Sequence, residues 1–449
     1  MQTVLAASAG SDLSWPMSPG RELELAARGA VLIPSYPLIA GVSRPLGYII
    51  KQYQEMGLVG EERNSANLSL SCFTRHLPAI NRRHVIPEGA SGSGKTTLTR
   101  TVLRPFWNDV EYYTRVTGAG LERRGISLEG KILYIEQLEG NQPDQLKYLM
   151  TGGNLTILSA ERDSSGKIVA TARQLDGEPV LVSTAVGTVV DPQLRNRASP
   201  LEIDESEEQT TRIMRNKLEH WANVHADDGE SACSQIRLID AKCKLLGQSV
   251  KEVKIPFAMQ LEQGLPKVLS MRRGTDRLTS LIGADAFMKA ALGFRPMVQL
   301  KEQVGRYVYV VALPEDLIDA LYCLGEAFAD SLTGFLERAR QVYEALQKNG
   351  GGSSSDMARV LILSQNRARE YLNYLVEQGY ATKTYDKGTY QYAAKPHDAP
   401  KLKLRASFTD SDLKQWFEKQ FPDNNADLIL PENKTEFESS AASTGADRI

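Results

Sequence analysis

The spacing of hydrophobic and polar residues changes from segment to segment along the 449-residue chain. Residues 1–45 are rich in proline, glycine and serine, which interrupt helices and predict an irregular arm. From Gly47, apolar residues recur at helical spacing on both sides of a glycine-containing turn, which predicts a pair of helices. Patterns typical of strands and helices then alternate within residues 46–224, which predicts a mainly parallel sheet with helices on both faces. Residues 225–332 carry a mostly helical pattern and predict a helical lid or connector.

The pattern at 333–396 predicts a second, smaller domain. A helical stretch ends before the glycine- and serine-rich segment Asn349–Ser355, which we interpret as a loop inside this domain. A helix–turn–helix pattern follows, in which Ser364 suits the N-cap of the second helix and Gly379 its C-terminal stop. A hairpin with its turn at 386–388 comes next. This order of elements predicts a winged helix.

The last segment, 397–449, is polar and acidic. It contains one amphipathic helical pattern, from Ser411 to Phe421. Beyond this helix we expect a flexible acidic tail that could bind a partner.

The composition is that of a globular protein, with 24% charged and 42% hydrophobic residues. No apolar run approaches the roughly 18 residues of a membrane span, and no basic stretch precedes an apolar one at the N-terminus, so we expect a cytoplasmic protein. Four widely spaced cysteines form no CxxC pair, which disfavours zinc and disulfides and predicts buried, reduced thiols. Because the net charge is −2, any DNA binding must depend on local basic clusters.

The strongest chemical signal is a phosphate-binding motif that stands between an apolar run and a helical pattern. In such a motif glycines let backbone N–H groups face the phosphates, Lys95 reaches the β- and γ-phosphates, and the Thr96 hydroxyl ligates Mg²⁺. The motif therefore predicts that ATP and Mg²⁺ are bound by Gly89, Ser91, Gly92, Ser93, Gly94, Lys95, Thr96 and Thr97.

A second apolar strand pattern, 131–138, ends in an acid. Glu136 is the candidate for organising Mg²⁺. The next position usually carries the carboxylate that polarises the attacking water, and here it is Gln137. Because an amide cannot act as a general base, we predict that the chain binds ATP far better than it hydrolyses it. We interpret Gln137 as a replacement of glutamate, either a deliberate one that traps the nucleotide-bound state or a difference of this lineage. Glu139 is a weaker stand-in, because strand alternation places it beyond the end of the strand.

Two alternating runs within residues 154–173 flank a polar turn and predict a β-hairpin with Arg162 and Lys167 at its tip. A hairpin at this place looks like the pore loop of a ring translocase, where cations hold the DNA backbone. A plain surface hairpin is the alternative. The following strand ends in Ser183 and Thr184, which we expect to sense the γ-phosphate or to hold the lytic water.

Two groups of arginines are candidates for contacting phosphate. Arg197, which we favour over Arg195, is expected to point into a neighbouring subunit's site and to stabilise transition-state charge. A surface salt bridge is the alternative. Further along, the candidates for a lid arginine are Arg272, Arg273 and Arg277, of which we select Arg273.

The second helix of the predicted winged helix begins with Gln365, Asn366, Arg367 and Arg369, where side chains reach a major groove. Arg367 and Arg369 are the candidates for contacting DNA. Residues 333–396 contain nine Lys/Arg against six Asp/Glu, which is only mildly basic. A winged helix that docks a protein therefore stays an open alternative.

Taken together, these motifs resemble the AAA+ helicase domains that accompany primases in mobile elements and plasmids, which are similar in plan to minichromosome maintenance helicases. The resemblance covers about residues 45–395 and rests on GLVGEE, GASGSGKTTL, ILYIEQLEG, GGNLTILSAE, PVLVSTA, LRNR, DESEEQT and RRGTDRL. It implies a hexameric ring that encircles DNA. It also implies that any priming comes from a separate primase or polymerase.

The leading prediction is an ATP-driven DNA translocase that works as a ring in replication, with single-stranded or forked DNA as its partner and no membrane. The first alternative is an ATP-switched initiator or helicase loader that binds DNA through the winged helix. The second is a non-replicative ATPase of defence or transposition.

Overall fold

The computed structural model of the chain describes residues 44–122, 127–138, 144–150, 155–162, 167–175, 177–186, 197–223, 229–265, 271–301, 305–333, 337–377, 379–386, 388–395, 404 and 406–431. Apart from its last two residues, the arm expected at 1–45 lies outside these ranges. The two helices expected from Gly47 are present as α2 (Pro45–Glu55) and α3 (Glu62–Phe73).

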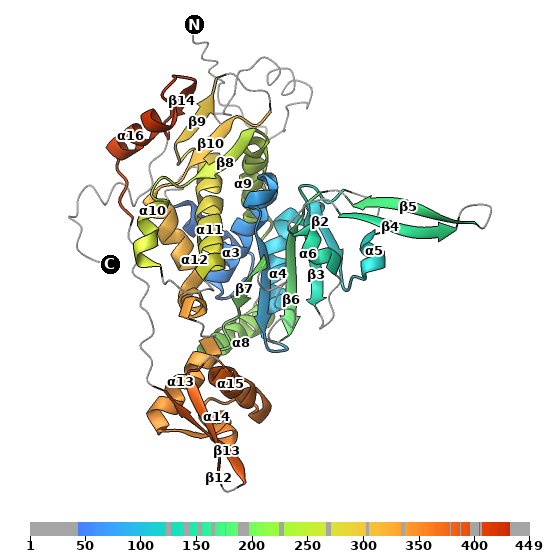
Figure 1. The fold of residues 1–449 in the computed structure, drawn as a ribbon, viewed down its shortest axis with the longest axis vertical. Coiled ribbons are helices and arrows are strands. Elements are labelled where there is room, and N and C mark those ends of the chain that lie inside the picture. Colours follow the sequence, from blue (N-terminus) through green and yellow to red (C-terminus); the bar gives the residue numbers. More distant parts are fainter. Residues whose placement is uncertain are drawn as a thin grey trace. The chain divides into compact units, whose positions relative to one another are not determined.

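Residues 84–202 contain a five-stranded parallel sheet (Figure 1). Its strands lie in the order β2 (Val110–Tyr113), β3 (Ile132–Leu138), β6 (Val180–Val186), β1 (His84–Gly89) and β7 (Ala198–Glu202). Strand β1, which leads into the phosphate-binding motif, pairs with β6 and β7 on its two sides. Because all five strands are parallel, their carboxyl ends meet at one edge of the sheet.

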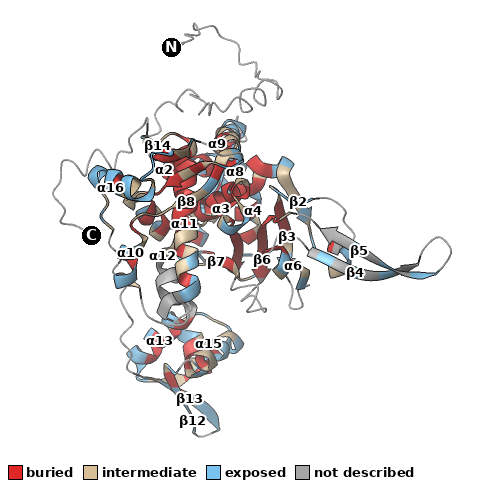
Figure 2. Ribbon diagram, turned by 45° about the horizontal axis from the view of Figure 1, so that its top comes forward, coloured by how far each residue is buried: buried red, intermediate tan, exposed pale blue. Residues whose placement is uncertain are grey.

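Helices pack against this sheet and bury its strands (Figure 2). Helices α5 (Gly118–Glu122) and α6 (Asp144–Leu149) contribute Leu121, Leu146 and Leu149 to a core with Leu133, Ile135 and Leu181 of the strands. The alternate strand residues Val85, Tyr134 and Val182 are also buried, and α3 and α4 (Lys95–Leu103) contact β1. Burial on both faces explains why these strands have almost continuous apolar runs. The predicted α/β fold of a P-loop ATPase is therefore present.

A separate two-stranded hairpin projects from the sheet between β3 and β6 in the chain (Figures 1 and 2). It consists of β4 (Leu155–Arg162) and β5 (Ile168–Leu175), which pair antiparallel from Leu155↔Leu175 to Arg162↔Ile168. The predicted hairpin is confirmed. Its polar turn, 163–166, lies outside the described residues.

The region expected to be a helical lid contains helices and an additional sheet. The helices of this region are α9 (Glu230–Ser249), α10 (Ala258–Leu261), α11 (Met271–Ala291) and α12 (Pro314–Thr333). Helix α8 (Glu207–Ala222) precedes them and falls within the predicted 46–224 segment. Three strands were not predicted: β8 (Val250–Lys254), β9 (Met297–Leu300) and β10 (Val308–Val311). They are four or five residues long, which is too short for a periodic pattern to stand out from flanking helices.

A buried group of charges joins α11 to α12. Lys289 Nζ lies 2.9 Å from Asp316 Oδ1, and Arg295 Nη2 lies 2.8 Å from the same oxygen. Burial raises the pKa of Asp316, but Arg295 and Lys289 outweigh this and hold it well below its usual range. Removal of one partner would leave a buried charge uncompensated, so the group fixes the two helices to each other.

Residues 337–395 form a small unit with its own core. Its elements are α13 (Glu337–Asn349), β11 (Gly352–Ser353), α14 (Ser354–Val360), α15 (Gln365–Glu377), β12 (Ala381–Asp386) and β13 (Thr389–Ala394). The core contains Val342, Leu346, Met357, Leu372 and Leu375. The Ser364 hydroxyl accepts the N–H of Arg367 at 3.3 Å, as expected for an N-cap, and Gly379 has a φ of 80°.

The C-terminal segment is more ordered than expected. Helix α16 (Asp410–Gln420) matches the predicted helix, but β14 (Ala426–Ile429) then pairs antiparallel with β9 and completes a four-stranded sheet. Leu413 and Ala426 are buried against Val298 and Val311. The expectation of a flexible tail directly after the helix is therefore wrong for β14. The partner of β14, strand β9, lies far earlier in the chain, so the local sequence pattern did not predict this strand.

All four cysteines are buried thiols, as the sequence predicted. Burial raises the pKa of Cys72 to about 12. Among the described residues, no helix combines the length and apolarity required to cross a bilayer.

Candidate functional site

The phosphate-binding motif lies between β1 and α4, at the carboxyl edge of the sheet. Gly92 and Gly94 have φ angles of 82° and 102°, values that favour glycine and allow successive backbone N–H groups to face one ligand. Lys95 Nζ donates a hydrogen bond to the carbonyl oxygen of Gly89 at 2.9 Å and another to that of Ala90. The ammonium group therefore lies against the loop that would enclose phosphate.

The hydroxyl groups of the motif lie at the same edge. Ser91 and Thr97 are exposed, while Ser93 and Thr96 are half-buried. Thr96 is the second residue of α4, one position after Lys95. Its place in the first turn of this helix agrees with the predicted role as a ligand of Mg²⁺.

Glu205, which the sequence did not single out, lies at the start of the same loop. Its carboxylate accepts the backbone N–H of Ala90, and a Cβ atom on Gly89 would lie 3.0 Å from Glu205 Oε1. A side chain at position 89 would therefore crowd this acid. Burial lowers the pKa of Lys95, and the Glu205 carboxylate opposes that shift.

Glu136 lies near the end of β3 and is held by two side chains. Arg100 Nη2 donates to Glu136 Oε1 at 3.0 Å, and the Tyr112 hydroxyl donates to Oε2. Neither partner was predicted. Carboxylate and hydroxyl oxygens are the ligands that Mg²⁺ prefers, so Glu136 and Thr96 fit that ion chemically.

Three further predicted site residues, Gln137, Ser183 and Thr184, lie on β3 and β6. Gln137 is exposed at the carboxyl end of β3. The Ser183 hydroxyl donates to the carbonyl oxygen of Ile135 at 2.5 Å, and the Thr184 hydroxyl donates to that of Glu136. Both hydroxyls thus fasten β6 to β3. Their hydrogen atoms are engaged with the protein, and the predicted contact with the γ-phosphate stays a prediction.

A second unpredicted contact ties the segment before α3 to the segment after β7. Gln209 Nε2 donates to the Val59 carbonyl at 2.6 Å, and the Asp204 N–H donates to Glu61 Oε1 at 2.9 Å. Gly60 has a φ of 67°, and a Cβ atom there would lie 2.3 Å from the Gln209 side chain. Glu205, which contacts the phosphate-binding loop, belongs to this tied segment.

Arg197 lies at the opposite edge of the sheet from the phosphate-binding loop of its own chain. It directly precedes β7, whose first residue, Ala198, pairs with His84 at the start of β1. The loop follows the other end of β1. A five- or six-residue strand, about 16–20 Å long, separates the two groups. Arg197 is thus unsuited to act on its own chain's nucleotide.

The lid arginines lie on α11. Arg272 and Arg273 are exposed near the start of that helix. Arg277 Nη2 donates to the Ala198 carbonyl at 3.1 Å, so this arginine supports the start of β7. Arg195 lies outside the described residues.

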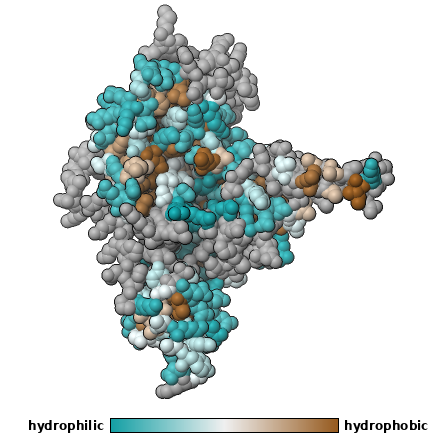
Figure 3. Space-filling view, in the orientation of Figure 1, coloured by the Kyte–Doolittle hydropathy of each residue, from teal (hydrophilic) through white to brown (hydrophobic). Residues whose placement is uncertain are grey.

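The hairpin β4–β5 presents both cationic and apolar side chains. Lys167 is exposed, and Arg162 is the last residue of β4. Leu158 is 74% exposed and Ile168 65% exposed. Figure 3 shows apolar surface along this hairpin. The hairpin thus exposes apolar side chains beside the cationic Lys167.

In the small C-terminal unit, Arg367 is half-buried and Arg369 is exposed at the start of α15. Gln365 and Asn366, the first two residues of the helix, are also exposed. The helix therefore presents polar side chains at its N-terminal end, as the sequence predicted.

The sheet and its loop give the chain the fold of α/β P-loop ATPases. No protein-family model and no curated protein matches it. Among solved structures, a full-length MCM homolog from Methanopyrus kandleri aligns at 16% identity with a TM-score of 0.37, over 71% of this chain and 63% of that one. The chain thus spans less than two thirds of that homolog.

Two other structures align less well. The Thermotoga maritima RuvB Holliday junction branch migration motor aligns at 16% identity and a TM-score of 0.27, over 73% of this chain and 90% of that one. JCV helicase aligns at 13% identity and a TM-score of 0.23, over 49% and 66%. With TM-scores below 0.5, these likenesses carry no functional weight, and function rests on the geometry of the site.

Proposed function

We propose that the chain is an AAA+ ATPase that uses ATP to move along and unwind DNA. The observation that carries the proposal is a complete phosphate-binding loop in a sheet from which a hairpin, β4–β5, projects directly before β6. The loop can bind the ATP whose hydrolysis drives movement. The hairpin carries the exposed Lys167, which can bind a phosphate backbone.

The roles at the nucleotide follow from the side chains. Lys95 binds the β- and γ-phosphates of ATP, while Thr96 and Glu136 hold Mg²⁺. Ser183 and Thr184, which fasten β6 to β3 at Ile135 and Glu136, orient the γ-phosphate end of the site in this proposal. Arg273 of α11 is the lid arginine that contacts phosphate. Gln137 takes the place of the general base, so the chain retains ATP longer than an enzyme with glutamate there.

A neighbouring copy completes the site. Because Arg197 lies at the amino edge of its own sheet, it suits the nucleotide of an adjacent subunit, where a guanidinium group stabilises transition-state charge. An arginine donated from subunit to subunit favours a closed ring, for which we propose six copies. DNA passes the β4–β5 hairpins, where Arg162 and Lys167 contact its backbone.

The unit at 337–395 acts as a winged helix. Its three helices and β12–β13 hairpin support this assignment, with Arg367 and Arg369 of α15 placed for a major groove. The biological setting that we propose is replication of a mobile element or plasmid, with a separate primase or polymerase.

A second function, an ATP-switched initiator or helicase loader, is favoured by one feature. The exposed polar start of α15 would bind duplex DNA without any contribution from the hairpin. In that case the β4–β5 hairpin would not be needed for the DNA-dependent step.

Replacement of Lys167 separates the two functions. In a Gln137→Glu background, Lys167→Ala should bind a fluorescent ATP analogue normally but lose at least about ten-fold in unwinding of a forked DNA. Lys217→Ala, which removes an exposed lysine of α8, is the matched control and should unwind normally. Equal unwinding by Lys167→Ala and Lys217→Ala would contradict the translocase and favour the loader.

A further inference from the structure

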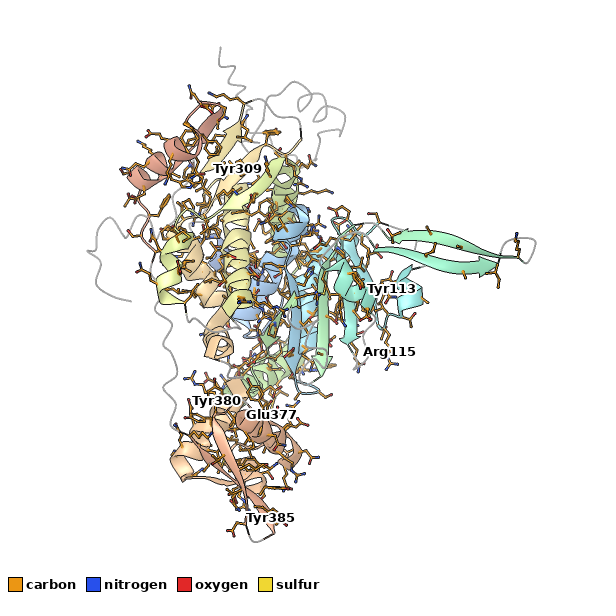
Figure 4. All side chains as sticks on the ribbon, in the orientation of Figure 1. Tyr113, Arg115, Tyr309, Glu377, Tyr380 and Tyr385 are labelled. Carbon is orange, nitrogen blue, oxygen red and sulfur yellow. The ribbon has the colours of Figure 1, made fainter. Side chains whose placement is uncertain are left out.

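The hairpin β12–β13 carries exposed aromatic side chains outside the core of residues 337–395. Three cross-strand pairs share one face: Ala381↔Ala394, Lys383↔Tyr392 and Tyr385↔Tyr390. At the base of the hairpin, Ala381 and Tyr392 are buried. Towards the tip, Tyr385 is 68% exposed and Tyr390 is 52% exposed. The face that packs on the core at one end thus opens to solvent at the other, where Figure 4 labels Tyr385.

The two exposed rings have a defined arrangement. Their centroids lie 5.1 Å apart with an interplanar angle of 63°. Lys383 Nζ lies 4.2 Å from the centroid of Tyr390 and donates to Asn373 Oδ1 of α15 at 3.0 Å. The Tyr392 hydroxyl donates to the same oxygen at 3.2 Å. These contacts fasten the hairpin to α15. The rings of Tyr385 and Tyr390 lie on the same face of the hairpin as Lys383 and Tyr392.

We propose that Tyr385 and Tyr390 bind the unpaired bases of single-stranded nucleic acid by stacking, at a site separate from the start of α15. This inference rests on the proposed function, because it adds a second contact for the same DNA. Local charge supports it. Residues 381–395 contain three lysines and one aspartate, a balance of +2 within a chain whose net charge is −2. The ammonium group of Lys383, 4.2 Å from the centroid of the Tyr390 ring, would meet a phosphate that flanks the stacked bases.

The chemistry favours unpaired over paired bases. In a duplex each base face is covered by its neighbours, so an exposed aromatic ring finds a stacking surface only where bases are single-stranded or splayed apart. A cross-strand tyrosine pair also stabilises a hairpin by itself. The experiment must therefore separate ring stacking from hairpin stability.

Binding of the full-length chain to a fluorescent oligothymidylate, and to a blunt duplex of equal length, makes this separation. The variant Tyr385→Val with Tyr390→Val removes both rings but keeps β-forming residues. It should bind the single strand about ten-fold more weakly and the duplex unchanged. Tyr385→Phe with Tyr390→Phe keeps the rings and should bind like the wild type.

A matched control changes the opposite face of the same strands. Thr384→Ala with Gln391→Ala alters a neighbouring cross-strand pair and should leave single-strand binding unchanged. Crosslinking from 5-iodouracil in the oligonucleotide should reach Tyr385 or Tyr390. Equal single-strand binding by the valine and wild-type proteins would overturn the inference, as would a parallel loss of duplex binding. A wild-type protein that binds neither DNA would overturn the proposed function as well.

Discussion

Gln137 stands exposed one residue after Glu136, at the edge of the sheet where the phosphate-binding loop lies. If the missing carboxylate limits hydrolysis, Gln137→Glu should raise the ATP turnover number by about 100-fold or more, which is the range of general-base catalysis. Phosphate release under saturating ATP measures this. Lys95→Ala in the same background should abolish the gain. A Gln137→Glu turnover equal to that of the wild type would show that the base lies elsewhere.

His84, at the start of β1, gives a prediction for pH. Burial lowers its pKa to about 4, and its Nδ1 accepts the Leu181 N–H at 3.0 Å. The folded pKa lies below the unfolded value of about 6.5, so the stability from the neutral ring is complete above that value and is lost as pH falls towards 4. From pH 7 to pH 5 this amounts to about 2 kcal/mol in the free energy of unfolding.

The variant His84→Asn isolates that effect, because an amide oxygen can accept the same N–H but does not titrate. Guanidinium denaturation at the two pH values should show a loss smaller by about 2 kcal/mol in the variant. An identical loss in both proteins would mean that folding does not lower the pKa of His84.

Some residues of the site could be predicted from the sequence and others could not. Lys95 and Thr96 were predictable because a contiguous motif fixes the loop that holds them. Glu205 and Tyr112 were not, because each reaches the site from another element, and Arg100 was not, because its partner Glu136 lies on a different element, β3. A lone acid or tyrosine in the sequence carries no sign of the partner that folding gives it.

At the scale of elements, predictability followed the length and repetition of each pattern. Strands β1, β3 and β6 of the central sheet and the β4–β5 hairpin have longer apolar or alternating runs, and the structure contains them. The sheet of β8, β9, β10 and β14 consists of strands of four or five residues that pair across distant parts of the chain. Such pairing is decided by tertiary contacts and leaves little local signal.

The C-terminal elements α16 and β14 should stabilise this second sheet. A chain that ends after Pro396 would uncover Val298, Val311 and the edge of β9. It should melt about 5 °C or more below the full chain. A chain that ends after Glu432 keeps both elements and is the control. Equal melting temperatures for the two shortened chains would show that the segment adds no stability.

At the scale of the whole molecule, the proposed ATPase cycle depends on contacts between copies of the chain. Arg197 and the phosphate-binding loop lie at opposite edges of one sheet. If Arg197 acts on nucleotide as proposed, it must therefore act on that of a second chain. A ring in which every chain both donates an arginine and receives one would also bring the β4–β5 hairpins together around DNA. Ring assembly should therefore depend on the binding of ATP and DNA. The oligomeric state is the property to measure.

The most direct test is the mass of the particle formed with ATP, Mg²⁺ and a forked DNA, measured by light scattering and single-particle imaging. We expect a closed ring of about six subunits on the DNA. We also expect that Arg197→Ala keeps ATP binding but loses turnover in the Gln137→Glu background. A monomer or dimer that binds DNA only through residues 333–396 would contradict the translocase and favour the initiator or loader.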